Sequence, residues 1–138
     1  MVTSERIHLN TRGNNDIIDI SGWVSQAVAK SGLRNGIVAI AVLGSTASVT
    51  TMEYEPGLVS DMQRLLERLA PAGVHYSHNE RWGDDNGHSH LRASLLGPSI
   101  VVPFSNGRLD VGTWQQIVLI DFDIRPRSRD ILIQVLGE

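Results

Sequence analysis

The stretch Gly36-Ile-Val-Ala-Ile-Ala-Val-Leu-Gly44 decides the fold, because it contains the longest uninterrupted apolar run in the chain. The run is far too short to span a bilayer. An apolar segment of this length between glycines is typical of a strand in the middle of a sheet. We therefore predict a buried central strand here, which the small and β-branched residues 45–52 continue as a strand or a bend.

The N-terminal side of this strand contains two predicted elements. Residues 2–9 alternate loosely between apolar and polar types, which predicts an opening strand. Asp19 or Ser21 can cap a helix that runs to about Ser31 and ends at Gly32. The stripe of this helix that is expected to face the core consists of Ile20, Trp23, Val24, Ala27 and Val28.

Two further helices are predicted in the middle of the chain. The first runs from about Pro56 to Leu69 and ends before Pro71, since the residue before a proline disfavours helix. The second covers residues 88–96 and stops at Gly97-Pro98. The apolar side of the first consists of Leu58, Met62, Leu65, Leu66 and Leu69.

The C-terminal third has the pattern of strands linked by hairpins. Ser99 to Pro103 predicts a strand with the proline at its end or on a sheet edge, and Asn106-Gly107 predicts a hairpin turn. Strands are also predicted over residues 108–111, 113–124 and 130–135, with a kink at residue 112 and a turn over 125–129. Residues 1–138 are therefore expected to form one α+β domain, with a largely antiparallel sheet and two or three helices.

Composition excludes several classes of protein. The 138 residues carry a formal net charge of −3 without a lysine or arginine block, so neither a nucleic acid nor a membrane is an expected partner. Cysteine is absent, which excludes disulfides, thiolate metal sites and cysteine nucleophiles. No glycine-rich phosphate loop and no G-x-S-x-G motif occurs, so neither a nucleotide cofactor nor a serine nucleophile is expected. Residues 1–12 do not resemble a signal peptide, which predicts a cytoplasmic protein.

Histidines gather in one polar segment, which makes it the first candidate for chemistry. Four of the five histidines stand at positions 75, 78, 88 and 90, in or beside residues 76–90, with carboxylates among them. This composition suits a metal, phosphate or proton-transfer site, and it also occurs in solvated loops.

The spacing His88-Ser-His90 leaves two alternatives open. In an extended backbone both imidazoles face the same way and can share a metal ion. In a helix, at about 100° per residue, they point roughly 200° apart, so at most one of them can be a ligand. His75 and His78 carry the same ambiguity.

Two carboxylates are candidates with equally ordinary alternatives. Glu53 follows a predicted strand and can face a pocket or be a solvated turn residue. Asp85 can be a metal ligand, a general base or the cap of the following helix.

Two arginines and a polar pair complete the candidates. Arg92 and Arg108 can each hold an anion with a bidentate fork, or simply cover the surface. Trp114 is of a type that usually packs in a core. Gln115 next to it would need a polar partner if it were buried.

Several motifs, taken in order, resemble the YjbQ-like family over nearly the whole chain. They are Ser45-Thr46-Ala47-Ser48, Tyr76-x-His78, Asp85-Asn86-x-x-x-His90-x-Arg92-Ala93-Ser94-Leu95-Leu96-Gly97-x-Ser99, Gly107-Arg108-Leu109, Gly112-Thr113-Trp114-Gln115 and Gly137-Glu138. This family is largely uncharacterised and is often labelled secondary thiamine-phosphate synthase. The resemblance implies a sandwich-like α+β domain, with helices on one side of a mixed sheet, that assembles as a homotrimer.

The resemblance also implies a pocket and a reaction. Thiamine-phosphate synthesis joins a pyrimidine-methyl diphosphate to a thiazole phosphate, which calls for a divalent cation, Zn²⁺ or Mg²⁺, and for cationic groups near the leaving diphosphate. The alternative is a non-catalytic trimeric module that binds a metabolite or a metal. The implied roles are catalysis by Glu53, Asp85 and Gln115, metal binding by His78 and His90, and substrate binding by Arg92, Arg108 and Trp114.

One position departs from the family pattern. Gly44 stands where many members carry a histidine, just before the Ser-Thr-Ala-Ser stretch. If that histidine is a metal ligand, His88 or Glu53 would have to replace it here.

Overall fold

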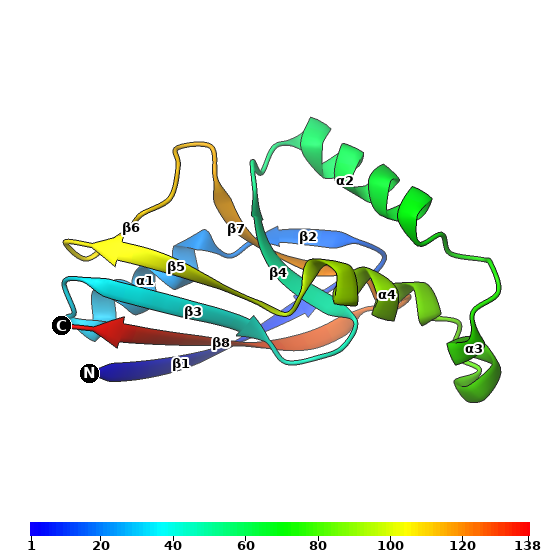
Figure 1. The fold of residues 1–138 in the computed structure, drawn as a ribbon, viewed down its shortest axis with the longest axis horizontal. Helices are drawn as coiled ribbons and strands as arrows, with labels where there is room; N and C mark the ends of the chain where they lie inside the picture. Colours follow the sequence, from blue (N-terminus) through cyan, green and yellow to red (C-terminus); the bar gives the residue numbers. More distant parts are fainter.

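The computed structural model describes all residues from Met1 to Glu138 and consists of two antiparallel sheets and four helices (Figure 1). The larger sheet has five strands in the order β1-β8-β3-β5-β6, and the smaller has three in the order β2-β7-β4. The α+β class predicted from the sequence is confirmed. The strands are β1 Val2–Thr11, β2 Asp16–Asp19, β3 Gly36–Val42, β4 Ala47–Met52, β5 Ser99–Ser105, β6 Arg108–Leu109, β7 Gln116–Asp121 and β8 Arg127–Gly137.

Two of the helices have the bounds that the sequence predicts. The α1 helix ends at Gly32, whose φ of 72° lies in the left-handed region. The α2 helix begins at Pro56, and the preceding Glu55 caps it by accepting hydrogen bonds from the amides of Gly57 and Leu58. The prediction lacked α3, a single short turn in a segment without an apolar stripe. The four helices are α1 Ser21–Ser31, α2 Pro56–Leu69, α3 Ser77–Trp82 and α4 Gly87–Leu96.

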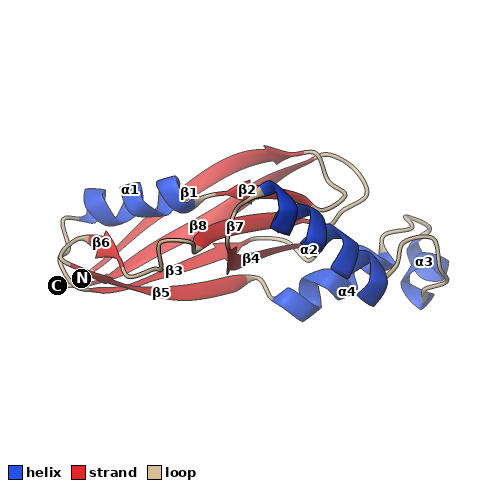
Figure 2. Ribbon diagram, turned by 90° about the horizontal axis from the view of Figure 1, so that it is seen from above, coloured by secondary structure: helices blue, strands red, loops and turns tan.

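The β7 strand is buried on both faces and separates two apolar cores (Figure 2). Successive side chains of a strand point to opposite faces. Ile117 and Leu119 therefore pack in the core between the two sheets, together with α1. Val118 and Ile120 pack in the second core, together with residues of α2 and α4. The molecule thus has three layers: the larger sheet, the smaller sheet, and the α2–α4 pair.

The β3 strand is the middle strand of the larger sheet, as predicted, but it is buried on one face only. Val38 and Ile40 are fully buried, whereas Ile37 is 43% exposed. The prediction of a buried central strand therefore holds for one face only, since no other part of the chain covers the outer, also apolar, face. On that face Ile37 lies between Leu136 and Pro103 of the neighbouring strands.

Other predicted features differ in detail. Trp23 of α1 and Leu65 and Leu69 of α2 are exposed rather than packed in a core. Pro103 lies inside β5, on the side where the short β6 has already ended. None of the helices has the length and apolarity that crossing a membrane requires.

A buried ion pair joins the two sheets where β7 leads into β8. Arg129 donates from Nε and Nη2 to the two carboxylate oxygens of Asp121, at 2.7 and 2.9 Å. The hydroxyl of Thr11, at the end of β1, donates to the same carboxylate at 2.6 Å. Arg129 also donates to the hydroxyl of Thr46, just before β4, at 2.6 Å. Strands of both sheets are therefore tied to one pair of opposite charges.

Replacing Asp121 with asparagine is expected to lower the free energy of unfolding by about 3–5 kcal/mol, because the buried Arg129 loses its hydrogen-bonded carboxylate and keeps only Asp123, 3.9 Å away. Denaturant unfolding of the two proteins measures this change. The control is Asp130→Asn, which removes the partly exposed contacts of this carboxylate with Arg6 and His8 and should cost less than about 1 kcal/mol. Equal losses in the two variants would contradict the central role of the buried pair.

Candidate functional site

The α3 and α4 helices bring His78 and His90 together, with ring centroids 4.3 Å apart. Because α4 begins at Gly87, the helical alternative applies to His88-Ser-His90, and their two imidazoles point in different directions. His88 is 4% exposed and packs beside Tyr76, with ring centroids 6.4 Å apart. Of the histidines in the polar segment, only His78 and His90 thus form a close pair.

Close packing at Gly87 holds α3 against the start of α4. A Cβ at this position would lie 2.7 Å from the Cβ of Tyr76, so a larger residue does not fit without a shift. The amide of Gly87 donates to Oδ1 of Asn79 at 2.9 Å, while Asn86, at the cap position, makes no side-chain cap hydrogen bond. Asp85 is exposed in the α3–α4 loop with a φ of 54°, so it does not cap the helix.

The histidine pair is weakly held by hydrogen bonds. His78 Nδ1 is buried without a hydrogen-bond partner, and Asp84 Oδ1 stands 3.5 Å away, beyond the usual hydrogen-bond range. Burial and the neighbouring His78 lower the pKa of His90 below its ordinary value, while Asp123 and Asp84 act in the opposite direction. His90 is therefore neutral at pH 7, the form that binds a metal or accepts a proton.

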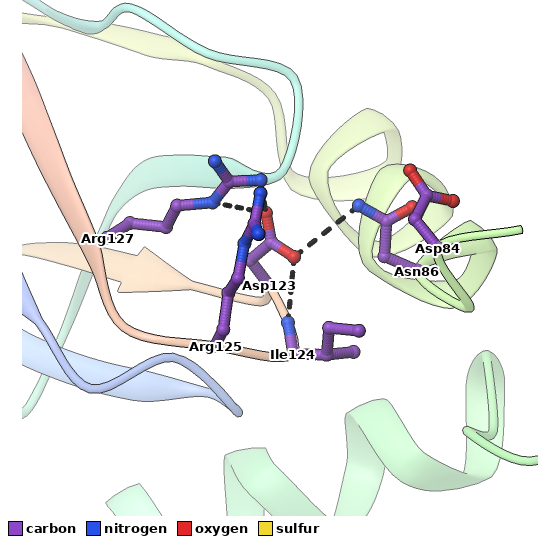
Figure 3. A pocket seen from close by; sticks show the side chains of 6 residues that line it. All are labelled: Asp84, Asn86, Asp123, Ile124, Arg125 and Arg127. Atoms are coloured by element: carbon purple, nitrogen blue, oxygen red, sulfur yellow. Dashed lines mark hydrogen bonds and ion pairs between the residues drawn. The ribbon is translucent and has the colours of Figure 1, made fainter. Parts of the chain in front are cut away.

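A cavity of about 190 Å³ opens beside Asp84, between the start of α4 and the turn from β7 to β8 (Figure 3). Its wall carries charges of both signs. The lining residues are Asp84, Asn86, Asp123, Ile124, Arg125 and Arg127.

Asp123 anchors the wall of this cavity. It is 1% exposed and accepts hydrogen bonds from the amide of Ile124 at 2.8 Å, from Arg127 Nε at 2.8 Å and from the Thr46 hydroxyl at 3.0 Å. Burial raises the pKa of this carboxyl, but these hydrogen bonds and the charge of Arg127 outweigh burial, so the pKa lies below its ordinary value. Asp123 is thus a buried carboxylate that stays ionised.

Asn86 connects the cavity to the histidine pair. In one orientation its amide donates to Asp123 Oδ1 at 3.4 Å, and in the reversed orientation it donates to Asp84 Oδ1 and Oδ2 at 3.0 and 3.3 Å. The reversed orientation gives shorter hydrogen bonds, and Asp123 already has other donors. Asn86 therefore holds Asp84 between His78 and the cavity.

Three other predicted site residues lie at the opposite end of β7. Glu53 follows the last residue of β4, which pairs with Gln116 at the start of β7. Gln115 donates from Nε2 to the Thr51 hydroxyl at 3.2 Å and accepts from the Gly112 amide at 3.0 Å. Trp114 is 74% exposed. The six residues of β7, at about 3.3 Å per residue, separate this group from the histidine pair by on the order of 20 Å.

The two arginines predicted to bind substrate lie away from the cavity. Arg92 is buried and donates from Nε and Nη2 to the carbonyl of Ala70, from Nη1 to Asn15, and from Nη2 to the Glu67 carboxylate. These hydrogen bonds connect α4 to α2, so Arg92 has a structural role. Arg108 is exposed in the β5–β6 hairpin, opposite Ser105.

One chain alone does not bring together enough potential ligands for a metal site. No group of three or more histidine, aspartate or glutamate side chains is arranged to hold an ion. The unpartnered Nδ1 of His78 and the neutral His90 fit two coordination positions. A complete site would need a ligand from elsewhere.

Position 44, where the resemblance implies a histidine, lies beside a guanidinium group. A Cβ at Gly44 would lie 2.7 Å from Nη1 of Arg129. A side chain at position 44 thus competes with Arg129 for space, and neither His88 nor Glu53 forms a group of three potential ligands with His78 and His90.

The sequence contained a signal for the cavity that the prediction did not use. Charged residues alternate at every second position from 121 to 129, as Asp121, Asp123, Arg125, Arg127 and Arg129. Residues 123–125 form a bend between the two strands, so the alternation does not place all five side chains on one face. It does gather five charges in the segment that leads from β7 into β8, and three of them, Asp123, Arg125 and Arg127, line the cavity.

Asparagine in place of Asp123 is expected to reduce the free energy of unfolding at pH 7 by about 1.5–3 kcal/mol, the usual value of hydrogen bonds to a charged group. A depressed folded-state pKa contributes stability that is present above the unfolded value of about 3.9 and is lost as the pH falls through the folded value. The variant should therefore lose less stability than the wild type between about pH 5 and pH 2.

Denaturant unfolding at a series of pH values measures this difference, with the exposed Asp61→Asn as control. An unchanged acid dependence in Asp123→Asn would contradict the role given to this carboxylate.

Comparison with known proteins identifies the family. The model of the UPF0047 protein YjbQ-like family matches residues 5–138. A UPF0047 protein of Methanothermobacter thermautotrophicus is 40% identical over 137 residues, which cover 99% of this chain and 94% of that protein. UPF0047 protein YjbQ of Escherichia coli O157:H7 is 36% identical over 104 residues, 75% of each chain.

Solved structures agree with the sequence matches. The crystal structure of a YbjQ-like protein of unknown function from Sulfolobus solfataricus P2 superposes with a TM-score of 0.95 at 37% identity, and covers 100% of this chain and 99% of that one. A hypothetical protein from Aeropyrum pernix K1 gives a TM-score of 0.92 at 32% identity, with 99% of each chain covered. The chain belongs to the YjbQ-like UPF0047 family.

Proposed function

We propose that the protein is a small homotrimeric enzyme that acts on a phosphorylated small molecule with a divalent metal, in a transfer similar to thiamine-phosphate synthesis. The observation that best supports this proposal is the histidine pair beside a charged cavity. His78 and His90 lie 4.3 Å apart, and Asp84 stands between His78 and the cavity wall.

In this proposal His78 and His90 hold the metal, and a residue of a neighbouring subunit completes its ligands. The bound metal would stabilise the negative charge that develops on a leaving diphosphate. His90 is neutral at pH 7 and can alternatively accept a proton at its imidazole nitrogen. Asn86 orients Asp84 through the hydrogen bonds of its reversed amide.

The trimer would bring the second group of predicted residues to the histidine pair. Glu53, Trp114 and Gln115 are too far from His78 within one chain, by on the order of the length of β7. The outer face of the larger sheet supports an assembly, because apolar residues on it are exposed, among them Ile37 at 43% and Val101 at 59%. A neighbouring subunit on that face could supply Glu53 and Gln115 to the pocket.

Metal binding can be tested without an activity assay. Titration of metal-free protein with Zn²⁺ in a calorimeter should show binding by the wild type. His78→Ala and His90→Ala should each weaken it by at least about tenfold, the loss that removal of even an outer-shell partner of a ligand can cause. His75→Ala is the control, since His75 is exposed and outside the pair. Equal binding by all four proteins would refute the assignment of the metal ligands.

A mixing experiment tests the shared site together with the reaction. Glu53→Gln and His90→Ala are each expected to be inactive in forming thiamine phosphate from its two phosphorylated precursors. Trimers reassembled from an equal mixture should regain roughly a quarter of the wild-type activity, because that fraction of sites combines the intact halves. Light scattering should give three times the chain mass of 15.1 kDa.

Failure of the mixture to recover activity would place the whole site in one chain. Absence of product from the wild type, with metal binding intact, would instead support the non-catalytic module.

A further inference from the structure

Two guanidinium groups reach the cavity beside Asp84, and only one of them has a partner in the chain. Arg127 contacts the carboxylate of Asp123 through Nε at 2.8 Å and through Nη2 at 2.7 Å. Arg125 lines the same cavity and makes neither a side-chain hydrogen bond nor an ion pair (Figure 3). An unpaired cation at the mouth of a cavity attracts an anion from solution.

The carboxylates near Arg125 are already engaged. Asp123 accepts from a backbone amide, a hydroxyl and Arg127, and its Oδ2 also lies 3.9 Å from Arg129. Asp84 accepts from Asn86 in the favoured orientation of the amide. The charge of Arg125 is therefore left for a ligand.

The geometry of the turn favours convergence of the two arginines. Arg125 lies in the bend that follows β7 and Arg127 begins β8, and both side chains line the cavity. Pro126 between them fixes its own φ, which stiffens the turn. The first residue before α4, Asn86, lines the opposite wall, where the positive end of the helix dipole adds to the attraction for an anion.

We infer that Arg125 and Arg127 form a phosphate subsite, which takes a phosphate or diphosphate group of the ligand. This inference rests on the proposed function and specifies which residues bind the phosphate. A planar carboxylate pairs its two oxygens with the two donors of one guanidinium group. A phosphate has tetrahedrally arranged oxygens, which can accept hydrogen bonds from two guanidinium groups at different angles. The subsite takes the role that the sequence suggested for Arg92 and Arg108.

Calorimetric titration with inorganic diphosphate, in the presence of a chelator and at low salt, tests the subsite. The wild type should bind diphosphate. Arg125→Gln should weaken binding by at least about tenfold, through loss of a charge-assisted pair of hydrogen bonds. Arg125 is exposed and unpaired, so this variant should fold normally. Arg108→Gln is the matched control, since Arg108 is also exposed but lies in the β5–β6 hairpin.

Two further variants sharpen the test. Arg127→Lys keeps the charge but loses the planar fork, and it should weaken binding less than Arg125→Gln if Asp123 continues to hold that side chain. Asp84→Asn should strengthen binding without metal, because a carboxylate that repels the diphosphate is removed. Weaker binding by Asp84→Asn under these conditions would overturn the charge arrangement.

The inference is refuted if the wild type does not bind diphosphate, or if Arg125→Gln binds it as tightly as the wild type. Equal losses in Arg125→Gln and Arg108→Gln would also refute it, since they indicate a diffuse charge effect. Because the titration involves neither metal nor turnover, a failed thiamine-phosphate assay with diphosphate binding intact would reject only the proposed reaction. If Arg125→Gln retains both enzymatic activity and diphosphate binding, only the assignment of the subsite is refuted.

Discussion

The buried ion pair between Asp121 and Arg129 is the constraint on which this end of the molecule depends. Both side chains are almost fully removed from solvent, and each would be costly to bury alone. Their bonds to Thr11 and Thr46 fix the ends of β1 and the start of β4 to the passage from β7 into β8. The two sheets are therefore held in one relative position at the place where the chain crosses between them.

The burial of β7 on both faces determines where polar side chains can form a site. From Ile117 to Ile120, β7 is buried by apolar layers on both sides, so it cannot present polar groups along its length. Polar side chains gather instead at its two ends. At one end are Asp123 and the cavity, and at the other are Gln115 and Trp114. The separation of the candidate residues into two groups is thus a consequence of a central strand buried on both faces.

Features with local signals could be predicted from the sequence, and features that depend on distant partners could not. Pro56 and Gly32 mark helix ends by their own backbone preferences, and the structure confirms both. The exposure of Ile37 depends on whether another layer covers its sheet, which periodicity does not reveal. The relation of His88 to His90 depended on where α4 begins, and the helix begins at Gly87, which packs closely against Tyr76. The structural role of Arg92 follows only from its hydrogen bonds to Ala70 and Glu67, which the sequence does not reveal.

Within the candidate site, the charged side chains differ in how many partners they have inside the protein. Asp123 is saturated with donors, so its charge is compensated inside the protein, whereas Arg125 has no partner and faces the cavity. Asp84 faces the histidine pair, where a cation would be favoured. In the proposed function, one side of the pocket would therefore take an anion and the other a metal ion. A phosphorylated ligand that bridges the two would have both of its electrostatic requirements met, which neither half of the pocket provides alone.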